Sequence, residues 1–303
     1  MKTHYWLFAS LFLLVSCKQE VAVNQVNQKA VPDQVATAED NIQTVLTRKT
    51  NLIGKVVHFQ ETQLTKGVTS TKFAYVDKDG LPMVLFFFRV DLNEKELTLK
   101  PLMPNGEQKF AMQCIPDMVR NNKYVGLRVL GAVNSDFFNM STGEPRSILY
   151  LNGQAVRTVL PETRSYFGLT QIGKPLIGDQ SVFAQQRSSI YDALGGYQRL
   201  IKAGLKVSQT DLSVHPRTAV GFTANNIVYF LVADGRNSAY SNGLTLGQVA
   251  EIMSALEIKE AINLDGGGSS TFVTNVPTLE VKNKPSDGSP RKVANGWAIC
   301  IKE

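Results

Sequence analysis

Residues 263–271 read Asn-Leu-Asp-Gly-Gly-Gly-Ser-Ser-Thr and follow directly on the apolar pair Ala261-Ile262. Each glycine costs roughly 0.5–1 kcal/mol of backbone order relative to alanine, so three in a row usually accompany a backbone that approaches another group closely. A glycine-rich turn without a function is the alternative interpretation. A strand that ends on a carboxylate and opens into glycines and hydroxyls favours chemistry, which we expect to be centred on Asp265.

The segment before this loop predicts a strand, a helix and a second strand. Residues 227–233 are an apolar strand that ends at Asp234-Gly235. Residues 246–256 predict a helix, because Thr245 and Gln248 form a capping box and apolar residues recur at helical spacing. Two carboxylates that end the two strands of such a unit are expected to share one rim of the sheet.

Short β-like runs separated by polar turns fill the rest of the chain. The continuous apolar run 83–90 predicts a strand that is buried on both faces. Further strands are expected at 55–60, 72–76, 96–100, 127–133, 147–151, 154–159, 166–171 and 218–223, and a short helix at 116–121. With no repeat and no clean internal boundary, the sequence predicts a single α+β domain over residues 50–303, with a mixed β-sheet core and packed helices. Residues 50–124 are a β-rich elaboration, and residues 125–303 carry the motifs described below.

The N-terminus resembles a bacterial lipoprotein signal. Lys2 precedes an apolar stretch, 5–15, that is too short to span a bilayer, and Ser16-Cys17 follows. We therefore expect residues 1–16 to be removed, Cys17 to carry lipid, and residues 17–49 to be a polar tether. The expected location is the cell envelope, with the chain anchored to a bacterial membrane on its periplasmic or outer side. A plain secretory signal is the alternative.

Charge and cysteine content exclude some functions and leave others open. The net charge is +6 in 303 residues, and no run of basic residues is present, so we expect no nucleic-acid partner. A mild positive charge suits an anionic substrate. Cys114 and Cys300 are permitted to form a disulfide in an oxidising envelope, but the sequence does not decide whether they do. Neither has the spacing of a metal ligand.

Polar clusters stand beside the predicted strands at 134–136, 215–218, 234–237, 265–270 and 285–291. Singly, each has an ordinary interpretation: Asp234-Gly235 as a turn, Arg217 as a surface charge, His215 as a loop residue. Together they fit a glycosyl-phosphate site. Carboxylates act as acid, base or nucleophile at an anomeric carbon, an arginine fork binds phosphate, and a glycine run with hydroxyls presents donors to an anion.

Five motifs in one order carry a family resemblance: HPRTAVG, VADGR, GLTLGQVAEIM, NLDGGGSST and PSDGSPR. Over roughly residues 125–300 the chain resembles the phosphodiester glycosidase family. The resemblance implies an α+β fold and hydrolysis of the bond between the anomeric carbon of a GlcNAc-like sugar and a phosphodiester oxygen. The substrate would be an envelope or extracellular glycosyl phosphate.

Matched by motif, the resemblance implies catalytic roles for Asp265, Asp234 and Asp136. The implied substrate-binding residues are Asn134, Arg217, Gly266, Gly267, Gly268, Ser269, Ser270, Asp287 and Arg291. Two positions depart from the family pattern: Ser135 stands where a glycine is usual, and Pro290 where an acid usually precedes the arginine. We expect Arg217 and the glycine N–H groups to hold phosphate, and Asp265 to face Asp234 and Arg217 across the strand ends.

Two alternatives stay open at this point. No cofactor is required, but oxygen ligands of the aspartates would suit a divalent cation such as Ca²⁺ or Mg²⁺; no metal ligand is assigned. The other alternative is a surface lipoprotein that binds glycan without cleaving it, because folds outlive their activities.

Overall fold

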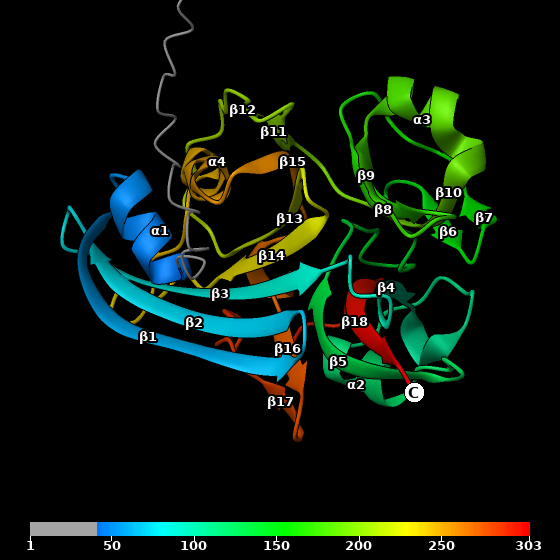
Figure 1. The fold of residues 1–303 in the computed structure, drawn as a ribbon, viewed down its shortest axis with the longest axis horizontal. Coiled ribbons are helices and arrows are strands. Elements are labelled where there is room, and N and C mark those ends of the chain that lie inside the picture. The colour runs from blue at the N-terminus through cyan, green and yellow to red at the C-terminus, as the bar shows by residue number, and fades with distance from the viewer. Residues whose placement is uncertain (1–40) are drawn as a thin grey trace, which may run out of the picture. The chain divides into compact units, whose positions relative to one another are not determined.

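The computed structural model describes residues 41–303 (Figure 1). The predicted signal sequence, Cys17 and most of the predicted tether lie outside the described residues. Among the residues described, no helix combines the length and the apolar character that a membrane span requires.

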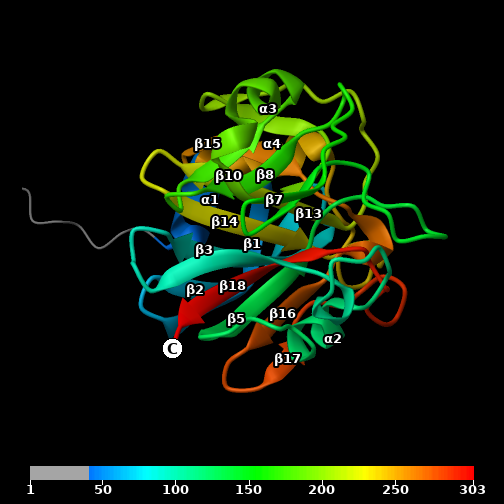
Figure 2. The ribbon, with the colours of Figure 1, turned by 90° about the vertical axis from the view of Figure 1, so that its right-hand side faces the viewer.

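Three antiparallel sheets form the domain (Figures 1 and 2). The eight-stranded sheet has the order β1 (Ile53–Thr65), β2 (Val68–Asp77), β3 (Pro82–Asp91), β14 (Ile227–Ala233), β13 (Arg217–Thr223), β15 (Ile258–Asn263), β11 (Arg199–Lys202), β12 (Leu205–Lys206). One five-stranded sheet has the order β7 (Gln154–Arg157), β6 (Leu149–Leu151), β10 (Ile190–Gly195), β8 (Tyr166–Thr170), β9 (Pro175–Gly178). The other has the order β17 (Leu279–Val281), β16 (Phe272–Asn275), β5 (Leu127–Asn134), β18 (Gly296–Lys302), β4 (Leu97–Leu102).

Four α-helices cover these sheets: α1 (Ile42–Lys49), α2 (Ile115–Arg120), α3 (Gln180–Gln186) and α4 (Leu246–Ala255). Short 3₁₀ turns occur at η1 (Pro104–Gly106), η2 (Arg187–Ser189) and η3 (Gly267–Ser269). Helices α1 and α4 lie on one face of the large sheet, while α2 and α3 lie beside the two smaller sheets (Figures 1 and 2). The predicted capping box of α4 is confirmed, since Thr245 and Gln248 bond each other's backbone.

The core of the molecule lies where the three sheets meet, and β3 contributes to both of its layers. Phe86 and Phe88 point into the shared core, where Phe88 stacks on Phe272 with ring centroids 3.9 Å apart. Leu85 and Phe87 alternate with them and pack under α1 and α4. The predicted burial of both faces of this strand is therefore confirmed, as the period-2 geometry of a strand between two layers requires.

The prediction of a mixed sheet was wrong, although the α+β description holds for a domain dominated by strands. Every strand pairing within residues 41–303 is antiparallel. The predicted strand, helix and strand do form β14, α4 and β15, but β13 lies between β14 and β15 and pairs with both. The two outer strands thus run in the same direction without pairing, and Asp234 and Asp265 follow their ends at one edge.

The folded domain also begins earlier than residue 50, so residues 42–49 do not belong to a tether. They form α1, which begins at the Asn41 cap and buries Ile42 and Leu46. These side chains, four residues apart, lie on one face and pack in the same cluster as α4. Two buried positions are too few to produce a sustained periodicity, so the sequence alone predicts a tether here.

The open question of the disulfide is answered by free thiols at both positions. Cys300 is buried in β18, and Cys114 is partly exposed before α2, where its Sγ contacts Asp117 Oδ2 at 2.9 Å.

Candidate functional site

The ends of β5, β14 and β15 and the start of β13 converge on residues 264–271, which we call the signature loop. The loop is attached on two sides by backbone hydrogen bonds. Asp265 N donates to Ser135 O at 2.8 Å, and Gly267 N donates to Pro216 O at 2.9 Å. The strand ends predicted from the motifs are therefore brought together by the fold.

Asn134 is the side chain that fixes this convergence. Its Nδ2 donates to Asp265 O at 2.6 Å, and its Oδ1 accepts from Thr218 Oγ1 at 2.9 Å and Thr271 N at 3.1 Å. It is fully buried, and these bonds satisfy its oxygen within the protein. The structure thus places Asn134 beneath the loop as a brace.

Asp265 lies partly exposed at the start of the signature loop. Its Oδ1 accepts from Gly266 N at 3.0 Å. Burial raises the pKa of Asp265 to about 6, an effect opposed by the Ser269 hydroxyl, the Gly266 N–H, and the charges of Arg291 and Arg164. A carboxylate that still ionises below neutral pH while kept from bulk water is suited to proton transfer.

Asp136 is a second carboxyl whose pKa is shifted, and the charge of Asp265 contributes to that shift. Its Oδ2 accepts from Ser147 N at 2.8 Å, while its buried Oδ1 has no hydrogen-bond partner among the described residues. Burial raises the pKa of Asp136 to about 7; Arg164 lowers it and the negative charge of Asp265 raises it further. Asp136 and Asp265 therefore form an interacting pair of carboxyls, and burial raises the pKa of both.

Arg164 is the site residue that sequence reasoning missed. It comes from the connection between β7 and β8 and approaches Asp136 Oδ1 with Nη1 at 3.6 Å. Its guanidinium lies over the rings of Phe137 and Tyr197, 5.1 and 4.8 Å from their centroids. No motif or periodicity surrounds residue 164, so the sequence holds no local signal that would have identified it.

Asp234 does not face Asp265 as we expected. It is buried, and its carboxylate accepts from Lys284 N at 2.8 Å, Asn283 Nδ2 at 3.0 Å and the Tyr240 hydroxyl at 3.2 Å. Burial raises its pKa, and these three bonds oppose the rise. Asn283 also donates to Ser270 O at 3.1 Å, which links Asp234 to the signature loop through a second residue.

Arg217 likewise points away from Asp265. Its Nε donates to Leu244 O at 3.0 Å and its Nη2 to Ser213 O at 2.6 Å, with Asp211 Oδ2 3.8 Å from Nη2. Backbone carbonyls thus accept from Nε and Nη2 of the guanidinium that we expected to hold phosphate. In this structure Arg217 links Ser213, in the connection before β13, to Leu244, in the connection between β14 and α4.

The glycines of the loop lie beneath charged side chains. A Cβ on Gly268 would collide with the Arg291 guanidinium and the Asp287 carboxylate, which are paired at 2.8 Å through Arg291 Nε. Gly267 has φ +60°, and a Cβ there would lie 3.0 Å from Arg236 Nη2. The run of glycines is therefore required because two arginines approach the backbone directly.

The remaining predicted binding residues of the loop, Gly266, Ser269 and Ser270, pack against other parts of the protein. A Cβ on Gly266 would lie 2.7 Å from Pro216 O. Ser269 and Ser270 are buried, and Ser270 Oγ accepts from Thr218 Oγ1 at 3.3 Å. Ser135, the departure from the family pattern, is also buried and donates to Gly195 O at 3.3 Å, so its hydroxyl points into the protein.

We expect Gly268→Ala to separate activity from stability. The added methyl must displace the ends of Arg291 and Asp287, which are flexible and partly exposed, so the free energy of unfolding should change by less than ~1 kcal/mol. If these side chains receive substrate, KM for a glycosyl phosphodiester should rise about tenfold. Urea unfolding and steady-state kinetics check both parts. Gly288→Ala is the control for a rim glycine with open space around it, where only the strain of φ +84° is added. An unchanged KM in Gly268→Ala contradicts the placement of substrate against Arg291 and Asp287.

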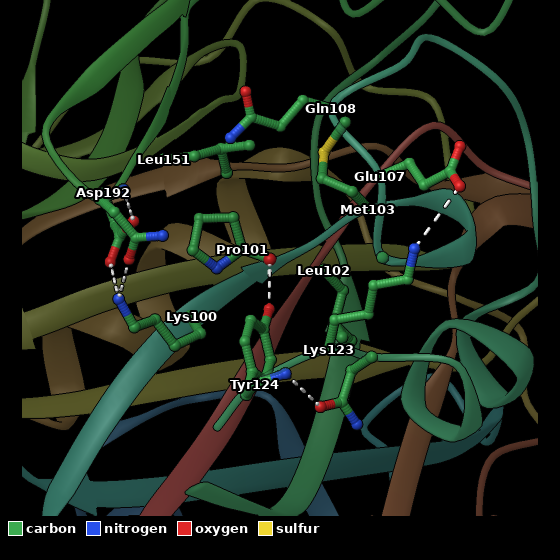
Figure 3. A pocket seen from close by; sticks show the side chains of 13 residues that line it. Lys100, Pro101, Leu102, Met103, Glu107, Gln108, Lys123, Tyr124, Leu151 and Asp192 are labelled. Carbon is green, nitrogen blue, oxygen red and sulfur yellow. Dashed lines mark hydrogen bonds and ion pairs between the residues drawn. The ribbon is translucent and has the colours of Figure 1, made fainter. Parts of the chain in front are cut away.

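Residues 41–303 contain no cluster of three or more His, Cys, Asp or Glu side chains arranged to hold a metal ion. A separate cavity of about 140 Å³ lies beside β4 and shares no residue with the signature loop (Figure 3). Its charged groups are paired with one another: Lys100 Nζ contacts Asp192 Oδ2 at 2.8 Å and Asn152 Oδ1 at 2.7 Å. We therefore place the candidate site at the signature loop.

A sequence profile of the family described as phosphodiester glycosidase matches residues 128–300, more than half of the chain. The chain belongs to the phosphodiester glycosidase family. The predicted family and its predicted extent are both confirmed. Mouse N-acetylglucosamine-1-phosphodiester alpha-N-acetylglucosaminidase is 29% identical over 199 residues, and the human enzyme 26%. Each match covers 57% of this chain but only 37% of the relative's length.

Solved structures show the same fold. One is the catalytic domain of zebrafish N-acetylglucosamine-1-phosphodiester alpha-N-acetylglucosaminidase, auto-inhibited by its pro-peptide. It aligns with a TM-score of 0.60 and 22% identity, over 81% of this chain and 88% of its own length. A hypothetical protein from Synechocystis aligns with a TM-score of 0.64 and 14% identity, covering 81% and 64% of the two chains.

Proposed function

We propose that this phosphodiester glycosidase family member hydrolyses the bond between the anomeric carbon of a GlcNAc-like sugar and a phosphodiester oxygen. The observation that carries the proposal is the Asp136–Asp265 pair at the signature loop of a family whose related animal enzymes bear that activity in their names. Most glycoside hydrolases use a pair of carboxyl groups at the bond that is cleaved.

Each group in the proposed mechanism has one task. Asp265, ionised above its pKa of about 6, takes a proton from water as that water bonds to the anomeric carbon; alternatively it attacks the carbon itself and forms a glycosyl ester that water then hydrolyses. The bond from carbon to the phosphodiester oxygen breaks, and the phosphate leaves as a monoester. Asp136 has a pKa of about 7 but no exposed surface, so it acts on Asp265 through its charge and does not contact the leaving oxygen.

The phosphate is proposed to rest on the glycine side of Asp265. Arg291 and Arg236 lie over Gly268 and Gly267 there, and an arginine fork suits phosphate. We propose these two arginines as the phosphate ligands in place of Arg217, which is buried and donates from Nε and Nη2 to backbone carbonyls.

Incubation of the purified chain with a GlcNAc-1-phosphodiester tests the proposal. We expect free GlcNAc and a phosphate monoester to appear, with no change in rate on adding EDTA. Restoration of a lost rate by Ca²⁺ or Mg²⁺ would instead support the bound-cation alternative. Saturable binding of the substrate without product would contradict the enzymatic proposal and favour a glycan-binding lipoprotein.

We further propose that Cys17 carries lipid and anchors the chain in the cell envelope, on the basis of the N-terminal sequence pattern alone. Metabolic labelling of the expressed chain with a clickable fatty acid, compared with Cys17→Ser, tests this. Equal labelling of both chains contradicts it.

A further inference from the structure

Arg164 occupies a position that its own hydrogen bonds do not explain. Its side chain is 16% exposed; it donates a long hydrogen bond to Gly196 O at 3.4 Å and approaches Asp136 Oδ1 at 3.6 Å. Burying a guanidinium lowers its pKa, and here burial is the largest cause of such a lowering. A buried cation with so few partners is costly unless a charge nearby compensates it.

Two aromatic rings hold the guanidinium in place. Phe137 and Tyr197 meet edge to face with centroids 5.7 Å apart, and Arg164 lies over both rings. A ring face attracts a cation without donating a hydrogen bond or carrying a full charge. The rings therefore fix the guanidinium in position without neutralising its charge, which acts on the nearby Asp136 carboxyl.

Several ionisable groups act on Arg164, and Asp136 acts on it most strongly. Asp136 and Asp265 both act on it electrostatically, together with the Tyr197 hydroxyl and the positive Arg146. On the far side of Asp265 the cation is Arg291, which Asp287 already neutralises at 2.7 Å. Arg164 is thus the cation common to both members of the pair.

We propose that Arg164 is a positioning residue that keeps the Asp136–Asp265 pair from holding protons on both carboxyls at neutral pH. The proposal rests on the proposed function for its catalytic meaning, since reaction at the anomeric carbon needs an ionised Asp265. The unpartnered Asp136 Oδ1 faces the guanidinium at a distance that allows attraction without a hydrogen bond. Asp136 can therefore both hold and release its proton.

Removal of the charge should move the pH profile in a stated direction. Without Arg164 the ionised forms of Asp136 and Asp265 lose stabilisation, so both carboxyls keep their protons to higher pH. We expect Arg164→Gln to shift the optimum of kcat/KM upward by about 1–2 pH units. Arg164→Lys, which keeps the charge, should shift it less. Arg157→Gln is the matched control, because Arg157 is 20% exposed and pairs with Glu144 away from the two aspartates.

Carbon NMR of the protein labelled at aspartate carboxyls supplies a readout that needs no turnover. Asp136→Asn and Asp265→Asn assign the two signals, whose midpoints should rise in Arg164→Gln. A raised KM with an unmoved optimum and unmoved midpoints overturns the proposal and indicates direct binding of phosphate by Arg164. If wild-type protein shows no hydrolysis, the proposed function fails, while the NMR midpoints still decide the role of Arg164.

Discussion

Asp265→Asn is expected to lower kcat on a GlcNAc-1-phosphodiester by about 100- to 10,000-fold, the range that a lost acid–base group produces. Asparagine is nearly isosteric and keeps an oxygen for the Gly266 N–H, so the loop should stay in place. It cannot accept a proton from water or attack the anomeric carbon. Discontinuous assay of released GlcNAc measures the effect.

The same substitution should stabilise the fold at pH 8. The pKa of Asp265 is about 6 in the folded chain, above the ordinary aspartate value of roughly 3.9. A folded-state pKa that is raised means stability present at low pH and lost as pH rises through about 4 to 6. Asparagine removes that loss, so unfolding should cost on the order of 1–2 kcal/mol more at pH 8 and little more at pH 4.

Asp211→Asn is the control for this experiment, because Asp211 is an exposed aspartate on the same rim, 3.8 Å from Arg217. Its activity should remain within a few-fold of wild type. Retention of full activity by Asp265→Asn would remove Asp265 from the chemistry. A loss of both activity and stability at pH 8 would instead identify it as a structural residue.

Asp234→Ala is expected to lower the free energy of unfolding by about 2–4 kcal/mol. The change leaves the N–H of Lys284 and the hydroxyl of Tyr240 without their acceptor in a buried site, and it removes one partner of Asn283. Urea denaturation monitored by fluorescence measures the loss. Tyr240→Phe, which removes a single 3.2 Å bond, should cost about 1 kcal/mol or less.

Asp234→Asn decides between the structural role and the catalytic role that the family motif suggested. Its shape is kept, so a folded fraction should be recoverable, and its kcat should lie within about tenfold of wild type. A loss as large as that of Asp265→Asn, in protein that is demonstrably folded, would show that Asp234 takes part in the chemistry.

The sequence predicts which strand ends meet better than it predicts where their side chains point. Asn134 and Asp265 follow apolar runs, and strand ends at a common rim follow from the strand, helix and strand pattern. The direction of Arg217 depends on the carbonyl of Leu244, which lies 27 residues along the chain, and on that of Ser213, in the irregular segment just before β13. Asp234 differs from its expected orientation for the same reason, because its acceptors are filled from residues 283 and 284, far along the chain.

Arg164 shows the limit of pattern reasoning more plainly. Its partners Phe137 and Tyr197 come from two other connections, and nothing near residue 164 in the sequence marks a site. Helix α1 was missed for a related reason, since its two buried side chains make sense only against α4.

Because β14 pairs with β3, residues 128–300, which the family profile matches, are not an autonomous folding unit. Strand β14 bonds to β3 along its whole length, from Ile227 opposite Asp91 to Ala233 opposite Leu85. A chain cut to residues 128–300 would present that strand as a bare edge and would uncover the apolar layer that Phe86 and Phe88 fill, both of which invite aggregation. The stretch that the family profile matches therefore depends on a flank outside that stretch, and the two must be expressed together.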